Sequence, residues 1–409
     1  MTLPPALRHR QFLIFWLGML LSWTGNQMLI WTLPWHIRAF TDNPAALGSI
    51  GLLRLLPTLT LSLFAGVLAD RLNRRKLTML TQSLMGLTAL TLALLTLSGR
   101  LQLWMIYALL LVHTAAFLLD LPARYALTPN IVPEEALTNA LGLETLALQI
   151  GGVAGPLLNG LLLERLGEQA SYLGAFLFFA GMVLTLALMG DVPQENAAPR
   201  GRGVDWEAIR EGVRFTFTHP LILPAMLLDF LATVMTRADS LLSYVARDIL
   251  HVSGSAYGLL TAAPMLGALT AGLVFAQLRT VRGQGRLVLG AVGMIGAGAV
   301  LFGLSRAFWL STAALYLMGA ADAVSTIVRS AIRQFQTPDR LRGRMTSVNQ
   351  IFFMGGPYLG DVKSGFLGSL IGVPLAIALG GVACVLGVAW IDRRWPQFRR
   401  YQGVENIQR

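Results

Sequence analysis

Ionisable side chains recur in this chain inside apolar stretches that are long enough to cross a membrane. Asp361 and Lys363 lie within the run GGPYLGDVKSGFLG, and Arg237 and Asp239 lie within another apolar stretch. A charge at membrane depth is costly and persists mainly where it faces protein or a water-filled cavity. Because helix positions two apart point to opposite sides, Asp361 and Lys363 do not neutralise each other. These residues predict a polar site within the membrane.

Four buried titratable side chains are candidates for carrying protons. A carboxylate desolvated at membrane depth can exchange a proton near neutral pH, and a buried imidazole can relay one. The alternative is structural: ion pairs for the carboxylates and an ordinary hydrogen-bonded core position for the histidine. In order of preference, the candidates are Asp229, Asp322, Glu144 and His113.

Polar and aromatic side chains near the middle of apolar stretches are candidates for lining the site. Trp23 and Asn26 lie near the middle of the first stretch, where an indole and an amide suit an aromatic, hydrogen-bonding solute. Core packing explains them equally well. The full set of candidate cavity residues is Trp23, Asn26, Gln27, Trp31, Arg54, Arg237, Asp239, Asp361 and Lys363.

The elements that must position these side chains are membrane-spanning helices. Of 409 residues, 55% are hydrophobic and 13% are charged, which is about half the charged share of a soluble protein. The apolar runs are continuous and rich in Leu, Ala and Gly, unlike the alternating strands of a membrane barrel. We expect an all-α membrane protein with twelve spans: 11–37, 46–69, 77–98, 101–124, 139–163, 170–190, 220–246, 254–278, 284–305, 307–330, 345–369 and 371–391.

The net charge of +11 follows the loops of this topology and does not indicate a nucleic-acid partner. Most Lys and Arg fall in the termini and in alternate loops on one side, which the positive-inside rule places in the cytoplasm. We therefore expect both termini in the cytoplasm and an uncleaved first span in the inner (cytoplasmic) membrane. The few on the other side are Arg38, Arg100, Arg165, Arg247 and Arg306.

The sequence argues against a metal centre, a cofactor and an enzyme. Cys384 is the single cysteine, so neither a disulfide nor a cysteine metal site is expected. The five histidines are scattered, and no Gly-rich phosphate loop followed by Lys-Ser/Thr occurs. A receptor would need a substantial sensory domain, and none is evident.

The chain contains an internal repeat. The run RYALTPNIVP (124–133) matches RSAIRQFQTP (329–338), and GLLRLLP (51–57) matches GLLTAAP (258–264), at offsets of 205 and 207. Parallel six-span repeats are a transporter architecture with the binding site at midplane between the halves. We expect two pseudo-symmetric bundles, 1–190 and 220–409, joined by a cytoplasmic linker, 191–219, that holds a short amphipathic helix with Trp206, Ile209, Val213 and Phe217 on one face.

The loop GVLADRLNRRKL (66–77) resembles the signature of the major facilitator superfamily. Asn73 stands where Gly is usual. The resemblance implies a charge relay that controls the conformational change, in which Arg74 reaches Asp120 near the end of its span. The implied gating residues of this region are Gly66, Asp70, Arg71, Arg74, Arg75, Asp120 and Arg124.

The stretch GLETLALQIGGVAGPLLNG (142–160) resembles the glycine-proline motif of proton-linked exporters in that superfamily. Small residues let helices approach closely, and the proline can kink the helix where two bundles rock. The matching positions, also assigned to gating, are Gly142, Gly151, Gly155, Pro156 and Gly160.

Finer similarity over nearly the whole chain extends to the enterobactin-exporter branch, which includes siderophore exporters and macrolide or multidrug efflux proteins. It rests on LPARYALTPNIVP (121–133), ADSLLSYVARDILHVSGSAYGLL (238–260), LGDVKSG (359–365) and RRWPQFRRYQG (393–403). That branch often carries a second acid where Lys363 stands. Arg54 and Asp361 lie at similar depth in spans that pack across the domain interface in that superfamily, so we expect them to pair there; the alternative is that each charge is satisfied within its own bundle. Lys363 is then expected to face the water-filled cavity or to extend towards the outer surface.

The resemblance implies a proton-coupled exporter of a small molecule such as a siderophore or a drug, working by alternating access. It would function as a monomer in the lipid bilayer and use the proton gradient instead of a cofactor. An importer or a lipid flippase on the same fold is the alternative, and a membrane enzyme is a remote one.

Overall fold

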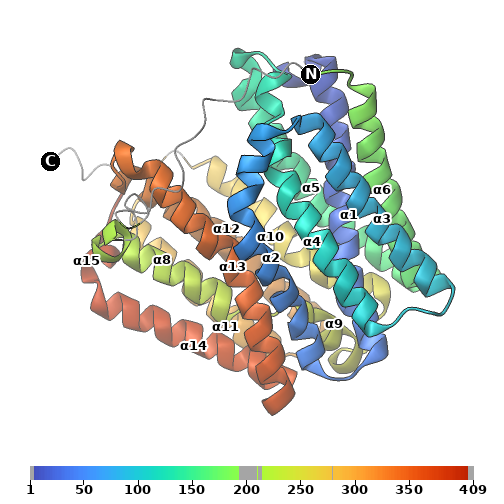
Figure 1. Ribbon diagram of the computed structural model, residues 1–409. Coiled ribbons are helices and arrows are strands. Elements are labelled where there is room, and N and C mark those ends of the chain that lie inside the picture. Colours follow the sequence, from blue (N-terminus) through green and yellow to red (C-terminus); the bar gives the residue numbers. More distant parts are fainter. Residues whose placement is uncertain (1–3, 193–209, 211–213, 279, 404–409) are drawn as a thin grey trace. The chain divides into compact units, whose positions relative to one another are not determined.

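The computed structural model describes residues 4–192, 210, 214–278 and 280–403, with the side chains at 63, 64, 66, 67, 69, 70 and 339–354 outside the description. Regular structure in the described part is helical (Figure 1). Most of the expected linker, including Trp206, Ile209 and Val213 of its amphipathic helix, lies outside the described residues; Phe217 is described and exposed.

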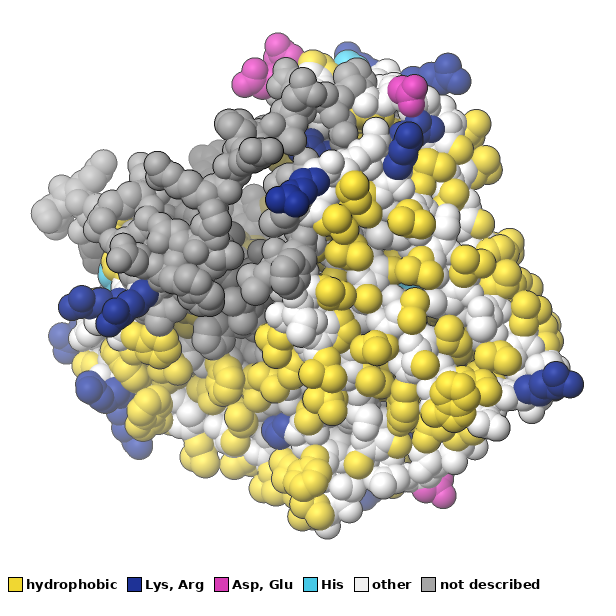
Figure 2. Space-filling model, viewed as in Figure 1, with side chains coloured by type: hydrophobic (Ala, Val, Ile, Leu, Met, Phe, Trp, Pro, Cys, Tyr) yellow, Lys and Arg dark blue, Asp and Glu magenta, His cyan; other side chains and the backbone are white. Residues whose placement is uncertain are grey.

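Ten of the described helices are long and apolar enough to cross a membrane. They are α1 (Arg10–Phe40), the first part of α2 (Pro44–Arg71), α3 (Arg74–Leu97), α4 (Leu103–Tyr125), α5 (Glu134–Leu166), α6 (Glu168–Leu188), α10 (Gly254–Ala276), α11 (Gln284–Leu304), α12 (Phe308–Gln336) and α14 (Val373–Arg394). Hydrophobic side chains spread over much of the described surface in Figure 2, as expected for helices that face lipid.

The two remaining spans expected from the sequence differ from these ten. The span expected at 345–369 corresponds to α13 (Asp339–Ile371), much of which has undescribed side chains. The span expected at 220–246 is not one continuous helix. It consists of α8 (Ile222–Phe230), a π-helical turn (Leu231–Met235), an irregular segment, a 3₁₀ turn (Asp239–Leu241), the short α9 (Leu242–Tyr244) and a second π turn (Val245–Ile249).

The chain divides into two compact units that resemble the expected halves but exchange two segments. Unit 1 comprises Met1–Asp42, Leu53–Gly201 and Val252–Ala262. Unit 2 comprises Asn43–Leu52, Arg202–His251 and Ala263–Arg409. The start of α2 thus packs with the C-terminal helices, and the start of α10 packs with the N-terminal ones.

Each unit is organised around one central helix. In unit 1, α1 packs against α5 and α6, and Phe12, Phe15 and Met19 of α1 are fully buried. In unit 2, α11 packs against α12 and α14, and Val288 and Val292 of α11 are fully buried. The short helix α15 (Pro396–Arg400) follows α14 and also contacts α11.

Glycines allow the two exchanged segments to contact backbone directly. In unit 2, a Cβ at Gly48 would lie 2.8 Å from the Cα of Gly365 in α13. In unit 1, a Cβ at Gly258 would lie 2.5 Å from the oxygen of Pro156 and 2.9 Å from the Cα of Gly160 in α5. Real Cβ atoms do not approach backbone this closely, so each contact requires glycine.

We predict that Gly258→Ala destabilises the protein. The added methyl group meets rigid backbone of α5, and such overpacking costs about 1–3 kcal/mol. Gly142→Ala is the matched control, because a Cβ at Gly142 meets nothing within 4 Å. Both changes add the same helix propensity. Thermal unfolding in detergent should show a lower Tm for Gly258→Ala and an unchanged or higher Tm for Gly142→Ala; equal Tm values would contradict the close contact.

Candidate functional site

The candidate site lies where the helical segment that begins at Ile222 is interrupted. Between Met235 and Asp239 the backbone leaves the helix, so several main-chain groups lose their usual partners. Backbone polar groups at membrane depth require a substitute partner. Helix α13 supplies these partners from its side chains.

Three side chains of α13 bind the broken backbone. Asp361 accepts hydrogen bonds from the main-chain N–H of Ser240 at 3.0 Å and from its hydroxyl at 3.2 Å. The Lys363 amine donates to the carbonyl of Met235, and the Ser364 hydroxyl donates to the carbonyl of Arg237 at 2.8 Å. A cation is favourable at the carbonyl end of a helix, so Lys363 stabilises the end of the π-helical turn that follows α8.

This arrangement corrects one expectation and leaves another as a prediction. Lys363 was expected to face the water-filled side, but its amine is engaged by Met235. The expected pair of Arg54 and Asp361 would join the two units and stays a prediction.

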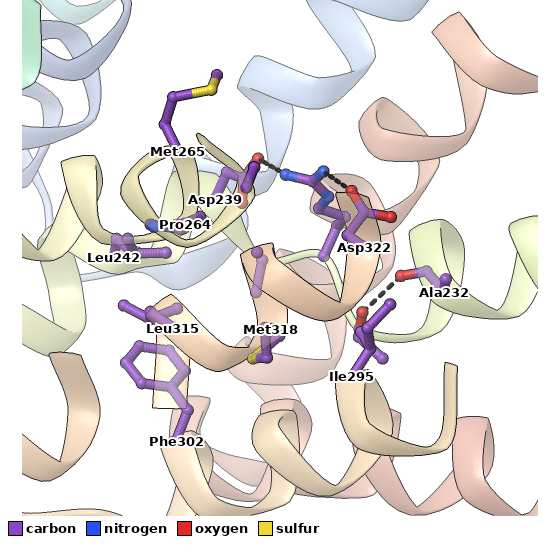
Figure 3. Close-up of a pocket in the computed structure, with 15 residues that line it drawn as sticks. Ala232, Asp239, Leu242, Pro264, Met265, Ile295, Phe302, Leu315, Met318 and Asp322 are labelled. Atoms are coloured by element: carbon purple, nitrogen blue, oxygen red, sulfur yellow. Dashed lines mark hydrogen bonds and ion pairs between the residues drawn. The ribbon is translucent and has the colours of Figure 1, made fainter. Parts of the chain in front are cut away.

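Arg237 lies at the break between two carboxylates. Its guanidinium is 3.2 Å from a carboxylate oxygen of Asp239 and 3.4 Å from one of Asp322, which comes from α12 (Figure 3). All three side chains border a cavity of about 150 Å³. The other lining residues are mainly apolar: Ala232, Thr236, Ala238, Leu242, Pro264, Met265, Ala268, Ile295, Phe302, Leu315, Met318 and Gly319.

The charges at the cavity are held loosely. The side chains of Arg237, Asp239 and Asp322 are 35%, 39% and 35% exposed, so water reaches all three. The Arg237–Asp322 distance exceeds the roughly 2.7–2.9 Å of a strong charge-assisted hydrogen bond. A proton or a bound solute can therefore compete with Arg237 for Asp322 at modest cost.

Asp229, the first candidate for proton transfer, lies in a different environment. Its carboxylate pairs with Arg329 of α12 at 2.8 Å, and the two side chains are 8% and 2% exposed. A buried ion pair with this geometry is costly to break. The structural alternative considered for Asp229 therefore describes this contact better than a mobile proton does.

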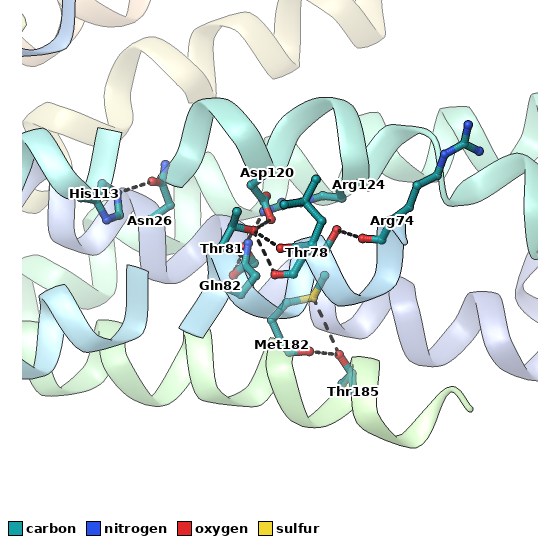
Figure 4. A network of polar contacts seen from close by, with 12 residues as sticks. Asn26, Arg74, Thr78, Thr81, Gln82, His113, Asp120, Arg124, Met182 and Thr185 are labelled. Carbon is teal, nitrogen blue, oxygen red and sulfur yellow. Dashed lines mark hydrogen bonds and ion pairs between the residues drawn. The ribbon is translucent and has the colours of Figure 1, made fainter. Parts of the chain in front are cut away.

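Arg124, which the repeat aligns with Arg329, is also buried and paired. It binds Asp120 one turn earlier in α4 and donates to the Ser22 hydroxyl at 2.9 Å (Figure 4). Thr81 donates to the other oxygen of Asp120 at 2.9 Å, and Ser22 donates to Gln82 at 3.0 Å. In both arginines Nε and Nη1 have no partner among the described residues.

The contacts made by the loop at 66–77 differ from the charge relay that the superfamily resemblance implies. Arg74 donates to the carbonyl of Ala126 and to Asn130, each at 3.0 Å, while Asp120 pairs with Arg124. The expectation that Arg74 reaches Asp120 is replaced by these contacts at the end of α4. Further members of the loop are placed as follows: Arg75 pairs with Asp191, Arg71 is exposed, and Gly66 and the Asp70 side chain lie outside the description.

Two of the four candidate residues of α1, Trp23 and Asn26, are buried, and Gln27 and Trp31 are half-buried. Asn26 lies 3.1 Å from His113, the indole of Trp23 stacks near Arg124 at 5.2 Å, and the carbonyl of Trp31 accepts from Tyr257 at 2.9 Å. Asn26 thus engages one ring nitrogen of His113, whereas the other, Nδ1, is buried without a partner among the described residues, so the role of His113 stays a prediction.

The glycine-proline motif mainly brings α1 and α5 together. A Cβ at Gly151 would lie 2.5 Å from that of Trp23, and one at Gly155 would lie 2.5 Å from that of Gln27. Gly160 and Pro156 instead contact the start of α10, and Gly142 has open space around it.

Glu144 is buried, at 3% exposure, and accepts a hydrogen bond from Thr128. Within the described part of the chain it forms no ion pair. This distinguishes it from Asp120 and Asp229, which both face arginine.

Sequence reasoning missed the small hydroxyl and amide side chains that complete these networks. Ser240, Ser22 and Thr81 carry no signal, because Ser and Thr commonly bond their own helix backbone. Gln82 had a usable signal, since an amide near the start of an apolar span requires a partner. Asn159 did too, and it accepts from Thr32 at 2.7 Å.

These features define a helical membrane transporter with a polar site at a discontinuous helix. The chain belongs to the transmembrane secretion effector family of the major facilitator transporters, whose model matches residues 2–401. It is a multi-pass membrane protein and not an enzyme.

Among individual proteins, the chain is similar to the enterobactin exporter EntS of Citrobacter koseri, with 30% identity over 322 residues, 78% of this chain and 76% of that protein. EntS of Shigella boydii is 31% identical over 328 residues, 79% of this chain and 77% of its own.

Solved transporters share the fold. A bacterial homologue of the lysosomal transporter Spinster, inward-facing and unoccupied, has a TM-score of 0.69 and 16% identity, covering 98% of this chain and 97% of its own. A bacterial homologue of the iron transporter ferroportin, also inward-facing, has a TM-score of 0.69 and 16% identity, covering 95% and 98%. At this identity the likeness shows the fold alone.

We predict that Arg329→Gln lowers stability strongly. The change leaves Asp229 buried without its counter-charge, which costs about 3–5 kcal/mol. The double variant Asp229→Asn/Arg329→Gln should recover much of the loss. The control is Arg306→Gln at an exposed position, where changes stay within about 0.5 kcal/mol. Thermal unfolding measures all three, and a Tm for Arg329→Gln equal to that of the control would refute the buried pair.

Proposed function

We propose that this protein is a proton-coupled exporter of a small organic molecule, such as a siderophore or a drug, in the inner (cytoplasmic) membrane. The observation that carries the proposal is the loosely held Asp239–Arg237–Asp322 group beside a helix break, at the edge of a cavity. Discontinuous helices in transporters commonly form the sites of substrates and coupling ions.

The proposed topology has twelve spans and cytoplasmic termini. Ten helices satisfy length and hydropathy, and we propose that the broken segment and α13 make the two further crossings. The distribution of Lys and Arg supports the orientation.

Proton movement and solute movement are coupled because the proton and the solute compete for the carboxylate of Asp322. When Asp322 is ionised it attracts Arg237 or a bound solute, and when it is protonated it holds neither strongly. A proton taken up on one side thus favours release of the solute, provided that binding differs between the two states. This is antiport by alternating access, with the proton gradient as the energy source and without a cofactor.

The contacts reorder the candidate proton carriers. Asp322 comes first because its partner is distant and water reaches it. Glu144 comes second, since it is buried, accepts a hydrogen bond from the Thr128 hydroxyl and forms no ion pair within the described residues. Asp229 and His113 follow, because Arg329 and Asn26 already engage them.

The similarity to proteins named enterobactin exporters supports export and a small organic substrate. The glycine-proline motif supports the same direction. We propose a monomer in the bilayer, and an importer or lipid flippase on this fold is the alternative.

The test is flux from proteoliposomes under an imposed pH gradient, acidic outside, with enterobactin and ethidium as the two probes. The gradient should accelerate efflux of at least one probe, and that efflux should carry protons inwards. Asp322→Asn should abolish the gradient-driven flux, because the neutral side chain can no longer take up and release a proton. It should also slow exchange of ethidium, because a neutral side chain at this position holds the cation only weakly.

Glu135→Gln is the control, since Glu135 is an exposed carboxylate outside the cavity, and it should keep full gradient-driven flux. If neither probe moves protons in the unaltered protein, coupled export is wrong. If Asp322→Asn keeps coupled flux, another group carries the proton.

A further inference from the structure

The cavity at the helix break carries an excess of negative charge. One guanidinium, Arg237, faces two carboxylates, Asp239 and Asp322. No other charged side chain is among the lining residues. The group therefore sums to one negative charge when all three side chains are ionised.

The neighbouring charges of α13 do not offset this excess. Lys363 is committed to the carbonyl of Met235, where it stabilises the end of the broken helix. Asp361 is committed to Ser240. Both side chains are thus bound to the broken segment at Ser240 and Met235, and neither lines the cavity.

The two carboxylates also retain capacity to accept contacts. An ionised carboxylate offers about four lone-pair positions. Within the described residues, Arg237 is the hydrogen-bond partner of both Asp239 and Asp322, at 3.2 and 3.4 Å. Arg237, by contrast, already faces two anions, so a third anion gains little there.

The remaining walls are apolar and deformable. Met265 and Met318 have flexible, polarisable side chains that adapt to different shapes, and Phe302 offers an aromatic ring. An aromatic face attracts cations more than anions. Walls of this kind bury the hydrocarbon part of an amphipathic ligand.

From this geometry we propose that the cavity binds an amphipathic organic cation, with its charged nitrogen beside Asp322 and Asp239 and its apolar part against Met265, Phe302 and Met318. The proposal rests on the proposed function and narrows its substrate class. The cation replaces Arg237 at Asp322, which is the more distant of its two carboxylate partners.

The test is equilibrium binding to the purified full-length protein, measured by calorimetry without a proton gradient. The probes are benzyltrimethylammonium and benzenesulfonate, which share an aromatic ring and differ in the sign of the charge. The cation should bind more tightly than the anion. Asp322→Asn should weaken cation binding about ten-fold, whereas Asp322→Glu, which keeps the charge, should largely preserve it.

Arg237→Gln gives the sharpest distinction. Removing the competing guanidinium should strengthen binding of the cation several-fold, because both carboxylates then face the ligand alone. Glu135→Gln should leave binding unchanged. Circular dichroism and gel-filtration profiles of each variant show that it is folded.

Two results overturn the proposal: tighter binding of benzenesulfonate that Arg237→Gln abolishes, or no binding of the cation at all. Neither result decides whether export is coupled to protons, which the flux assay in proteoliposomes tests separately. Conversely, cation binding with the predicted response to Asp322→Asn, together with no proton-coupled flux, supports the cavity proposal and removes the proposed mechanism.

Discussion

The structure of unit 2 depends on the substitution of side-chain partners for lost main-chain hydrogen bonds. A helix that breaks at membrane depth leaves polar backbone groups that lipid cannot satisfy. Asp361, Lys363 and Ser364 of α13 meet this requirement with three side chains in four residues. Gly356 and Gly360 let α13 approach Thr233 and Arg237 closely enough to do so. The break in turn places Arg237 beside Asp239 and Asp322, so the scaffold and the cavity have one physical origin.

Apart from Asp361 and Lys363, which bind backbone, the charges that form ion pairs in the apolar stretches fall into two groups with different roles. Asp120, Arg124, Asp229 and Arg329 are buried in ion pairs, and their separation is costly. Arg237, Asp239 and Asp322 are about one-third exposed, and their rearrangement is cheap. Only the second group combines charge, water access and a cavity, which are the properties that a site for exchange between a proton and a solute requires.

Much of the fold was predictable, because hydrophobic length, loop charge and the internal repeat each report on topology. The cavity group was partly predictable: Arg237, Asp239 and Asp322 were all named from their depth in apolar stretches. The roles of Asp229 and Lys363 were not, since sequence gives depth but not the direction of a side chain. The break near Met235 was also missed, because no proline or glycine marks it; the irregular backbone is stabilised from α13, which lies more than a hundred residues later.

The two repeat-related arginines give the halves of the protein different mechanical properties. Arg124 and Asp120 belong to the same helix, so the ion pair itself lies within α4. Hydrogen bonds with the neutral side chains of Ser22 and Thr81 join it to α1 and α3. Arg329 and Asp229 belong to α12 and α8, so their pair clamps two helices together. Tilting α8 away from α12 would separate two opposite charges, whereas moving α4 away from α1 and α3 would break hydrogen bonds and leave the ion pair intact. The repeat thus keeps a buried arginine in each half, but its carboxylate comes from the same helix in one half and from a neighbouring helix in the other.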